Sequence, residues 1–108
     1  MQVLKQINEV EDLEKNNSKL ETISDKYCRA ILNTTIYHPK AATDIAIDTK
    51  IPLSTIYRRI QMLLDQKLLS ISGLIKDGKR TYLYKSKIKG INCVFDKGQV
   101  KVELELNR

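Results

Sequence analysis

The hydrophobic pattern of this 108-residue chain changes its period at about residue 69, and this change constrains the fold more than any other feature. Before it, apolar residues recur every three or four positions, which is the spacing of amphipathic helices. After it, apolar and polar residues alternate around two tight turns, which is typical of β-hairpins. We therefore expect one α+β domain, in which N-terminal helices pack against C-terminal hairpins.

The N-terminal segment predicts two helices. The first spans Val3–Leu20, and its apolar residues fit a heptad frame in which Asn17 shares the seam. Such a helix can pair two chains, or it can be an ordinary helix that Asn16-Asn17-Ser18 interrupts, and the sequence leaves both readings open. The second helix takes Ser24 as its N-cap. It stops before His38-Pro39, because the residue ahead of a proline is forced out of the helical conformation.

A third and a fourth helix are predicted to form a helix-turn-helix. The third helix is short and opens at Thr43-Asp44, and the small Ala46 near its centre allows the next helix to approach closely. The connection over residues 48–51 is short enough to force a steep angle between the two helices. The fourth helix has Pro52 in its first turn, where the missing N–H costs nothing, and it runs to about Leu68.

The fourth helix has two different faces when it is projected at about 100° per residue. The face predicted to join the core consists of Leu53, Ile56, Ile60, Leu63 and Leu64. The opposite face and its margins carry hydroxyl, amide and guanidinium groups, from Ser54, Thr55, Tyr57, Arg58, Arg59 and Gln61. Such groups can reach base edges and phosphates in a major groove. Any exposed amphipathic helix shows polar groups, so this face alone does not decide the function.

Two hairpins are predicted from the C-terminal part. The first spans residues 71–84 around Asp77-Gly78, a pair that suits a type I′ turn because both central residues need positive φ. The second spans residues 91–106 around a turn at 96–98. Its last strand alternates strictly, so one face is expected to be buried. The apolar residues of that face are Val100, Val102, Leu104 and Leu106.

Positive charge gathers in the C-terminal part of the chain. The net charge is +6, and the segment Lys76–Lys89 contains six basic residues and one acidic residue. Such a field attracts polyanions, nucleic acids among them. The basic residues predicted to hold phosphates surround the first tight turn or flank the helix-turn-helix, and they are Lys40, Arg59, Lys76, Lys79 and Arg80.

The stretch Thr43–Ser86 resembles winged helix-turn-helix regulators of the ArsR-like class, in the form common in archaea. The resemblance rests on "DIA" at 44–46, "IPLSTIYRRI" at 51–60, and "GLI" at 73–75 leading into "DGKRTYLY" at 77–84. It implies a dimeric transcription regulator that places the helix starting near Pro52 in the major groove. The family's contact positions then match Ser54, Thr55, Tyr57, Arg58 and Arg59. One departure is Thr49-Lys50, which stands where the turn often carries a glycine.

Cofactor chemistry and catalysis are not expected. Cys28 and Cys93 lie far apart and outside any CxxC spacing, which favours small core residues in a reducing compartment. With His38 they have no metal-ligand spacing, so no metal site is predicted. Gly-rich phosphate loops and the GxSxG motif are absent, so the chain is not predicted to be an enzyme.

Other nucleic acids and membranes are also disfavoured. Tyr57, Tyr82 and Tyr84 form no evident stacking platform in the sequence, which argues against single-stranded nucleic acid. The N-terminus lacks the pattern of a signal peptide and no apolar run is long enough to span a bilayer, so we expect a cytoplasmic protein.

The sequence therefore predicts an N-terminal helix within residues 1–22, a candidate dimerisation element, followed by a winged helix-turn-helix domain over 23–108 that includes the second hairpin. The expected function is sequence-specific binding of double-stranded DNA by a homodimer on a pseudo-palindromic site, to regulate transcription. The alternative is a winged-helix protein–protein interaction module of a transcription or chromosome assembly. The candidate dimer surfaces are the N-terminal helix and the apolar face of the last strand, unless that face packs onto its own domain.

Overall fold

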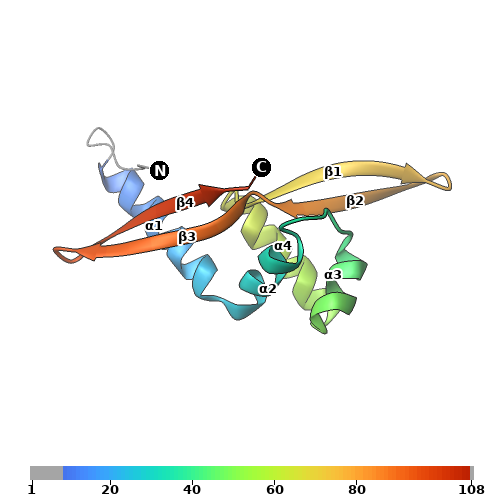
Figure 1. The fold of residues 1–108 in the computed structure, drawn as a ribbon, viewed down its shortest axis with the longest axis horizontal. Coiled ribbons are helices and arrows are strands. Elements are labelled where there is room, and N and C mark those ends of the chain that lie inside the picture. Colours follow the sequence, from blue (N-terminus) through green and yellow to red (C-terminus); the bar gives the residue numbers. More distant parts are fainter. Residues whose placement is uncertain (1–8, 108) are drawn as a thin grey trace.

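The computed structural model describes residues 9–107, with side chains from Glu14 onward. Four helices precede four strands, which confirms the predicted α+β order (Figure 1). Their bounds are α1 (Glu9–Ser24), α2 (Lys26–Thr34), α3 (Ala42–Thr49), α4 (Leu53–Asp65), β1 (Leu69–Lys76), β2 (Lys79–Ser86), β3 (Ile88–Asp96) and β4 (Gln99–Leu106). The start that was predicted for the first helix, at Val3, lies outside the described residues.

Helix α1 is continuous through Asn16-Asn17-Ser18, so the predicted interruption is wrong. Asn16 is buried, and its Nδ2 donates a hydrogen bond to the carbonyl oxygen of Val100 in β4, at 3.3 Å. Asn17 is exposed in the monomer. The run is tolerated because its one buried amide is satisfied by a strand carbonyl instead of competing with the helix backbone.

Helix α2 begins one residue later than predicted. Ser24 is the last residue of α1, and Asp25 is the N-cap, with its carboxylate accepting a hydrogen bond from the backbone N–H of Cys28 at 2.9 Å. Both residue types make good N-caps, so the sequence pattern could not separate them. Near the other end, the buried Thr35 hydroxyl donates to the carbonyl oxygen of Ile31 at 2.9 Å.

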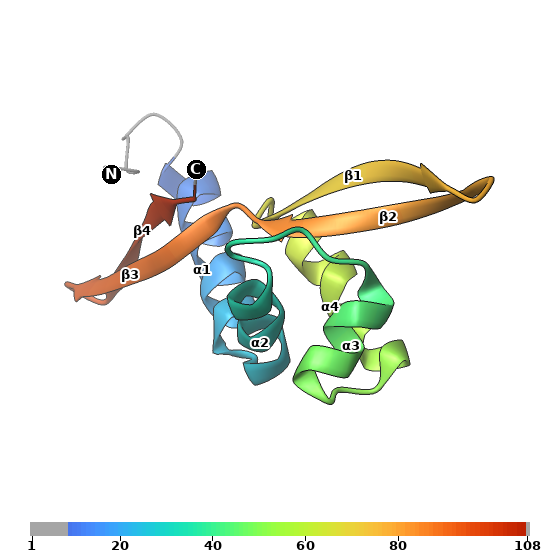
Figure 2. The same cartoon turned by 45° about the vertical axis from the view of Figure 1, so that its right-hand side comes forward.

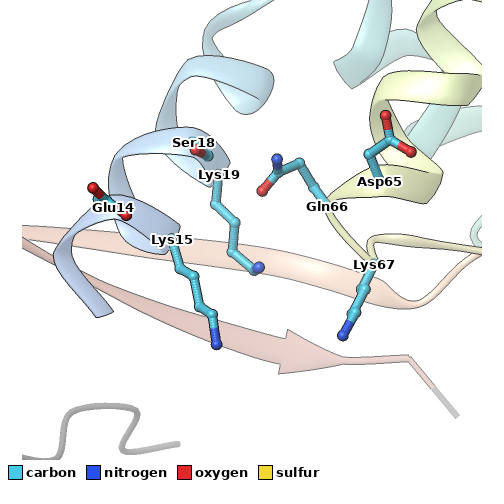
Figure 3. Close-up of a pocket in the computed structure, with 7 residues that line it drawn as sticks. All are labelled: Glu14, Lys15, Ser18, Lys19, Asp65, Gln66 and Lys67. Carbon is cyan, nitrogen blue, oxygen red and sulfur yellow. The ribbon is translucent and has the colours of Figure 1, made fainter. Parts of the chain in front are cut away.

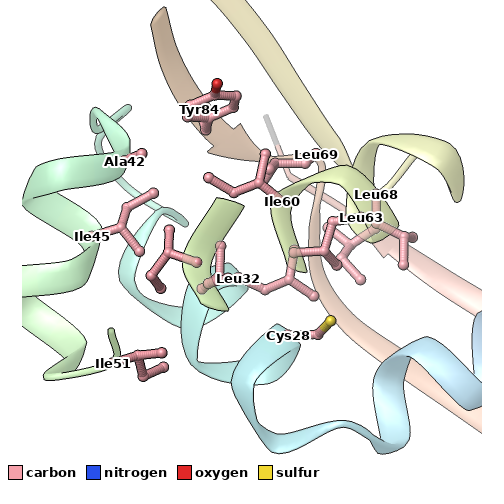
Figure 4. Packing of buried hydrophobic residues seen from close by; sticks show 13 residues of the cluster. Cys28, Leu32, Ala42, Ile45, Ile51, Ile60, Leu63, Leu68, Leu69 and Tyr84 are labelled. Carbon is pink, nitrogen blue, oxygen red and sulfur yellow. The ribbon is translucent and has the colours of Figure 1, made fainter. Parts of the chain in front are cut away.

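The core lies between α2, α3 and α4 and is closed by the start of β1 and the end of β2 (Figure 4). Ile56, Ile60 and Leu63 of the predicted α4 stripe are buried in it, as expected. Leu53 was also predicted to be buried but is 39% exposed, and Leu64 is only half-buried. Both lie at the margins of the stripe, where a helix leaves the surface against which it packs.

Helix α4 ends at Asp65, three residues before the predicted end. Lys67 adopts a left-handed conformation with φ of 61°, and the N–H of Leu68 then donates to the carbonyl oxygen of Leu63 at 2.9 Å. This arrangement stops the helix and satisfies its last carbonyls. Leu68 is fully buried, so it anchors the passage from α4 into β1.

The strands form two separate antiparallel hairpins, β1–β2 and β3–β4. Asp77 and Gly78 have φ of 53° and 74°, as a type I′ turn requires. Lys97 and Gly98 repeat this pattern with φ of 53° and 79°, so the second turn is tighter than predicted and Asp96 belongs to β3.

The two hairpins extend to opposite ends of the elongated molecule (Figures 1 and 2). A short bridge between Lys40 and Tyr84 ties the α2–α3 connection to the edge of β2. Strand β4 packs along α1, and Val102 at this contact is only 1% exposed. Part of the apolar face of β4 therefore packs onto its own chain, whereas Leu106 at its end is exposed.

No helix within the described part of the chain is long and apolar enough to cross a membrane.

Candidate nucleic-acid interface

The turn between α3 and α4 is built without a glycine. Lys50 takes a left-handed conformation with φ of 60°, and its N–H donates to the carbonyl oxygen of Ala46 at 2.8 Å. Ile51 then inserts into the core, and Pro52 stands as the N-cap of α4. The departure noted at Thr49-Lys50 thus leaves the helix-turn-helix intact, because Lys50 itself supplies the positive φ.

The outer face of α4 lies open along the helix. Ser54, Tyr57, Arg58 and Gln61 are exposed, and Thr55 is half-buried, so this part of the predicted face is placed as expected. The Gln61 amide nitrogen donates to Asp65 Oδ1 at 2.9 Å, which orients Gln61 along the exposed row.

Arg59 does not join this face. Its Nε donates to Asp25 Oδ2 at 3.0 Å, and its guanidinium lies 5.3 Å from the ring centroid of Tyr27. Partial burial opposes ionisation of Asp25, but hydrogen bonds from Arg59 and the Cys28 N–H outweigh it and lower the pKa of that carboxyl. Arg59 thus links α4 to the start of α2, and its predicted role as a contact to DNA stays a prediction.

Lys40 is also engaged within the protein. Its Nζ lies 2.6 Å from Asp48 Oδ2 and donates to the Thr34 hydroxyl at 2.7 Å. The hydrogen bond from Lys40, opposed by slight desolvation and helped by its charge, lowers the pKa of Asp48. The ammonium therefore holds α2 and α3 together, and its binding of a phosphate stays a prediction.

The first hairpin carries its basic residues at the far end. Lys76 and Lys79 face each other across the turn, and Arg80 pairs with Ile75 in the next register position. All three basic residues are exposed, as predicted. Among residues 14–107, none of them forms an ion pair with a carboxylate, so their charge faces solvent.

A groove of about 290 Å³ connects this hairpin to the helix-turn-helix. Its walls come from the start of α3, from α4 and from β2, and the lining residues are Ala41, Ala42, Thr43, Tyr57, Arg80, Thr81, Tyr82 and Tyr84. Polar and apolar surface share the lining of the groove, and a guanidinium, two threonine hydroxyls and two exposed tyrosines meet there. Such groups can contact the sugars and phosphates of a nucleic-acid strand.

The three tyrosines are closer together than the sequence suggested. Tyr84 is buried beneath the groove, and burial together with the nearby Tyr57 and Tyr82 hydroxyls raises its pKa. Tyr57 and Tyr82 remain exposed on the groove wall. Arg80, Tyr82 and Tyr84 alternate along β2, a period-2 signal that the sequence contained. The proximity of Tyr57 could not be read without knowing how α4 and β2 pack.

The two cysteines have different environments. Cys28 is fully buried, as expected, and burial together with the adjacent Asp25 raises the pKa of its thiol to about 12. Cys93 is exposed on β3, so the prediction of a core residue is wrong there, because β3 extends beyond its helical cover. His38 is exposed as well. Within the described residues, no three His, Cys, Asp or Glu side chains gather as a metal site.

This architecture resembles that of two solved structures. No protein-family model and no curated protein matches the sequence. Among solved structures, one match is a homodimeric winged helix-turn-helix DNA-binding domain, Mb0332 from Mycobacterium bovis, described as a possible ArsR-family transcriptional regulator. It has a TM-score of 0.62 and 20% identity, over 76% of this chain and 72% of that one. A second is NolR from Sinorhizobium fredii, with a TM-score of 0.63 and 20% identity, over 82% of this chain and 84% of that one.

The chain has a winged helix-turn-helix fold. In the terms of that fold, α4 stands in the place of the recognition helix and β1–β2 is the wing. The groove lined by Tyr57 and Arg80 is thus the space between recognition helix and wing.

Proposed function

We propose that this protein is a transcriptional regulator that binds double-stranded DNA sequence-specifically, as a homodimer on a pseudo-palindromic site, in the cytoplasm. The observation that carries the proposal is the groove in which the exposed face of α4 meets the basic wing. A duplex whose major groove received α4 would bring its backbone against the wing. The solved neighbour from M. bovis supports the proposal, since it is itself homodimeric and DNA-binding.

The proposed contacts fall into two groups. The base edges are contacted from α4, by Ser54, Thr55, Tyr57, Arg58 and Gln61. Phosphates are held from the wing, by Lys76, Lys79 and Arg80. The first group gives sequence preference, because each base pair shows a distinct pattern of donors and acceptors in the major groove. The second group gives affinity that depends on salt but carries no preference. The archaeal form of the ArsR-like class stays a prediction from the sequence resemblance.

The test is selection of bound duplexes from a random pool by the full chain, followed by affinity measurements on the selected site and on single-base variants of it. We expect an enriched, two-fold-symmetric site. Arg58→Ala should remove about 1–3 kcal/mol of discrimination at one base pair of each half-site. Lys79→Ala should weaken all duplexes alike.

The opposite result has a clear meaning. If no duplex binds at low salt, or if Arg58→Ala and Lys79→Ala act identically on every sequence, the DNA-reading proposal fails. The winged helix would then be a protein-binding module, the alternative considered from the sequence.

A further inference from the structure

A second groove lies at the other end of α4, between the connection that follows this helix and α1. It has a volume of about 460 Å³. The residues around it are polar or charged, and they are Glu14, Lys15, Ser18, Lys19, Asp65, Gln66 and Lys67. Figure 3 shows the side chains of Lys15, Lys19 and Lys67 extending toward the same side of the groove, from two elements far apart in the sequence.

Regular backbone structure fixes the positions of the Cα atoms that carry these lysine side chains. Lys15, Ser18 and Lys19 occupy positions i, i+3 and i+4 of α1, so they share one face of that helix. Lys67 is held by the left-handed stop of α4, with its N–H donating to the carbonyl oxygen of Leu64 at 3.0 Å. The fold therefore brings the three lysines to one side of the groove (Figure 3).

The positive charges of these lysines repel one another. Partial burial, and then repulsion from Lys15 and Lys67, lowers the pKa of Lys19. Two carboxylates also line the groove, but Asp65 accepts a hydrogen bond from Gln61 on the outer face of α4. Among residues 14–107, neither Glu14 nor Asp65 forms an ion pair with the three lysines. A bound anion would relieve the repulsion between the ammonium groups.

The lining also limits the class of anion. No aromatic or aliphatic residue lines the groove, so a nucleobase would find no ring on which to stack. Lysine ammonium groups suit phosphate oxygens, which they bind as point charges. We propose that Lys15, Lys19 and Lys67 form a binding site for phosphate groups.

Two sources could supply these phosphates. One is the backbone of a duplex that extends past the C-terminal end of α4, since Asp65 and Gln66 lie directly after the exposed row of that helix. The other is a free polyphosphate. The site itself does not rest on the proposed DNA-binding function, because the lysines converge whether or not a duplex is bound.

The first arm of the test uses inorganic pyrophosphate as the probe, titrated into the full chain at low ionic strength and followed by amide chemical shifts. We expect saturable shifts centred on residues 15–19 and 65–67. Lys19→Gln should weaken binding by roughly fivefold or more. The matched control is Lys89→Gln, which changes an exposed lysine of β3 and should leave the affinity unchanged. Thermal unfolding of both variants checks that each is folded.

Shifts spread evenly over the basic residues of the wing, or an unchanged affinity in both Lys19→Gln and Lys67→Gln, would overturn the site. The second arm measures a long duplex with the same variants. The salt slope is the slope of the logarithm of the binding constant against the logarithm of the salt concentration. If its magnitude falls by about 0.9 for each lysine removed, the DNA backbone is the source of the phosphates. An unchanged slope together with lost pyrophosphate binding identifies a free polyphosphate. If no duplex binds at all, the first arm still decides the question.

Discussion

The two hairpins share the same turn geometry but differ in what their strands pack against. Both turn on a pair of residues with positive φ, and Gly98 follows Gly78 by 20 positions. The strand positions correspond with the same offset, so Val102 of β4 matches Tyr82 of β2. Val102 is 1% exposed against α1, whereas Tyr82 is 45% exposed beside α4.

The difference shows that the strand side chains, and not the turn, set the role of each hairpin. Strand β4 packs along α1 (Figure 2), and Val102 in the middle of its apolar row is buried there. The corresponding row of β2 runs from Arg80 through Tyr82 to Tyr84, and only its inner end reaches the core. The first hairpin thus leaves most of this row exposed, while the second buries the middle of its row at Val102.

The largest expected effect is on the free energy of unfolding, at the corresponding positions Val102 and Tyr82. Val102→Ala should lower the free energy of unfolding by about 2 kcal/mol, because it removes a buried side chain and leaves a cavity. Tyr82→Ala should lower it by less than about 1 kcal/mol, since the ring is half in solvent. Urea unfolding measures both. Equal losses would mean that the two hairpins are packed to the same extent.

A smaller effect is expected where α1 meets β4. Asn16→Ala removes the hydrogen bond from Nδ2 to the Val100 carbonyl, and it should cost about 1 kcal/mol of unfolding free energy. Asn17→Ala is the control, since Asn17 is exposed and should have nearly no effect. If the two variants lose stability equally, α1 does not hold β4 in the way described.

The smallest expected effect on the protein comes from chemical labelling of the two cysteines, which needs no mutation. Cys93 should react quickly with a thiol alkylating agent, because it lies on the exposed outer part of β3. Cys28 should stay unlabelled in the folded protein, since it is fully buried and its thiol has a pKa of about 12. Mass spectrometry of digested protein measures both. Protection of Cys93 at every protein concentration would show that the cover of β3 extends further toward its tip.

Features set by neighbouring residues could be predicted from the sequence. The Asp77-Gly78 turn depends on local φ preferences, and the Ile56, Ile60 and Leu63 stripe follows from helical periodicity. Both were confirmed. The exposed polar face of α4 follows from the same projection, and most of it lies where it was expected.

Features set by tertiary partners could not be predicted. Lys40 and Arg59 were assigned to phosphates because of their charge, but each is paired with a carboxylate, Asp48 or Asp25. Nothing in a linear pattern shows which acid will meet which base. The groove beside Tyr57 was missed for the same reason, because it exists only where β2 packs beside α4.

One measurement tests most directly the proposal that the wing β1–β2, and not the second hairpin, holds the DNA backbone. Duplex affinity is determined over a range of salt concentrations for the wild type, for Lys79→Ala in the wing, and for Lys101→Ala in β4, a lysine three positions beyond Gly98 of the second turn. We predict that Lys79→Ala lowers the magnitude of the salt slope by about 0.9 and that Lys101→Ala leaves it unchanged. An equal or larger loss of slope for Lys101→Ala would contradict the account.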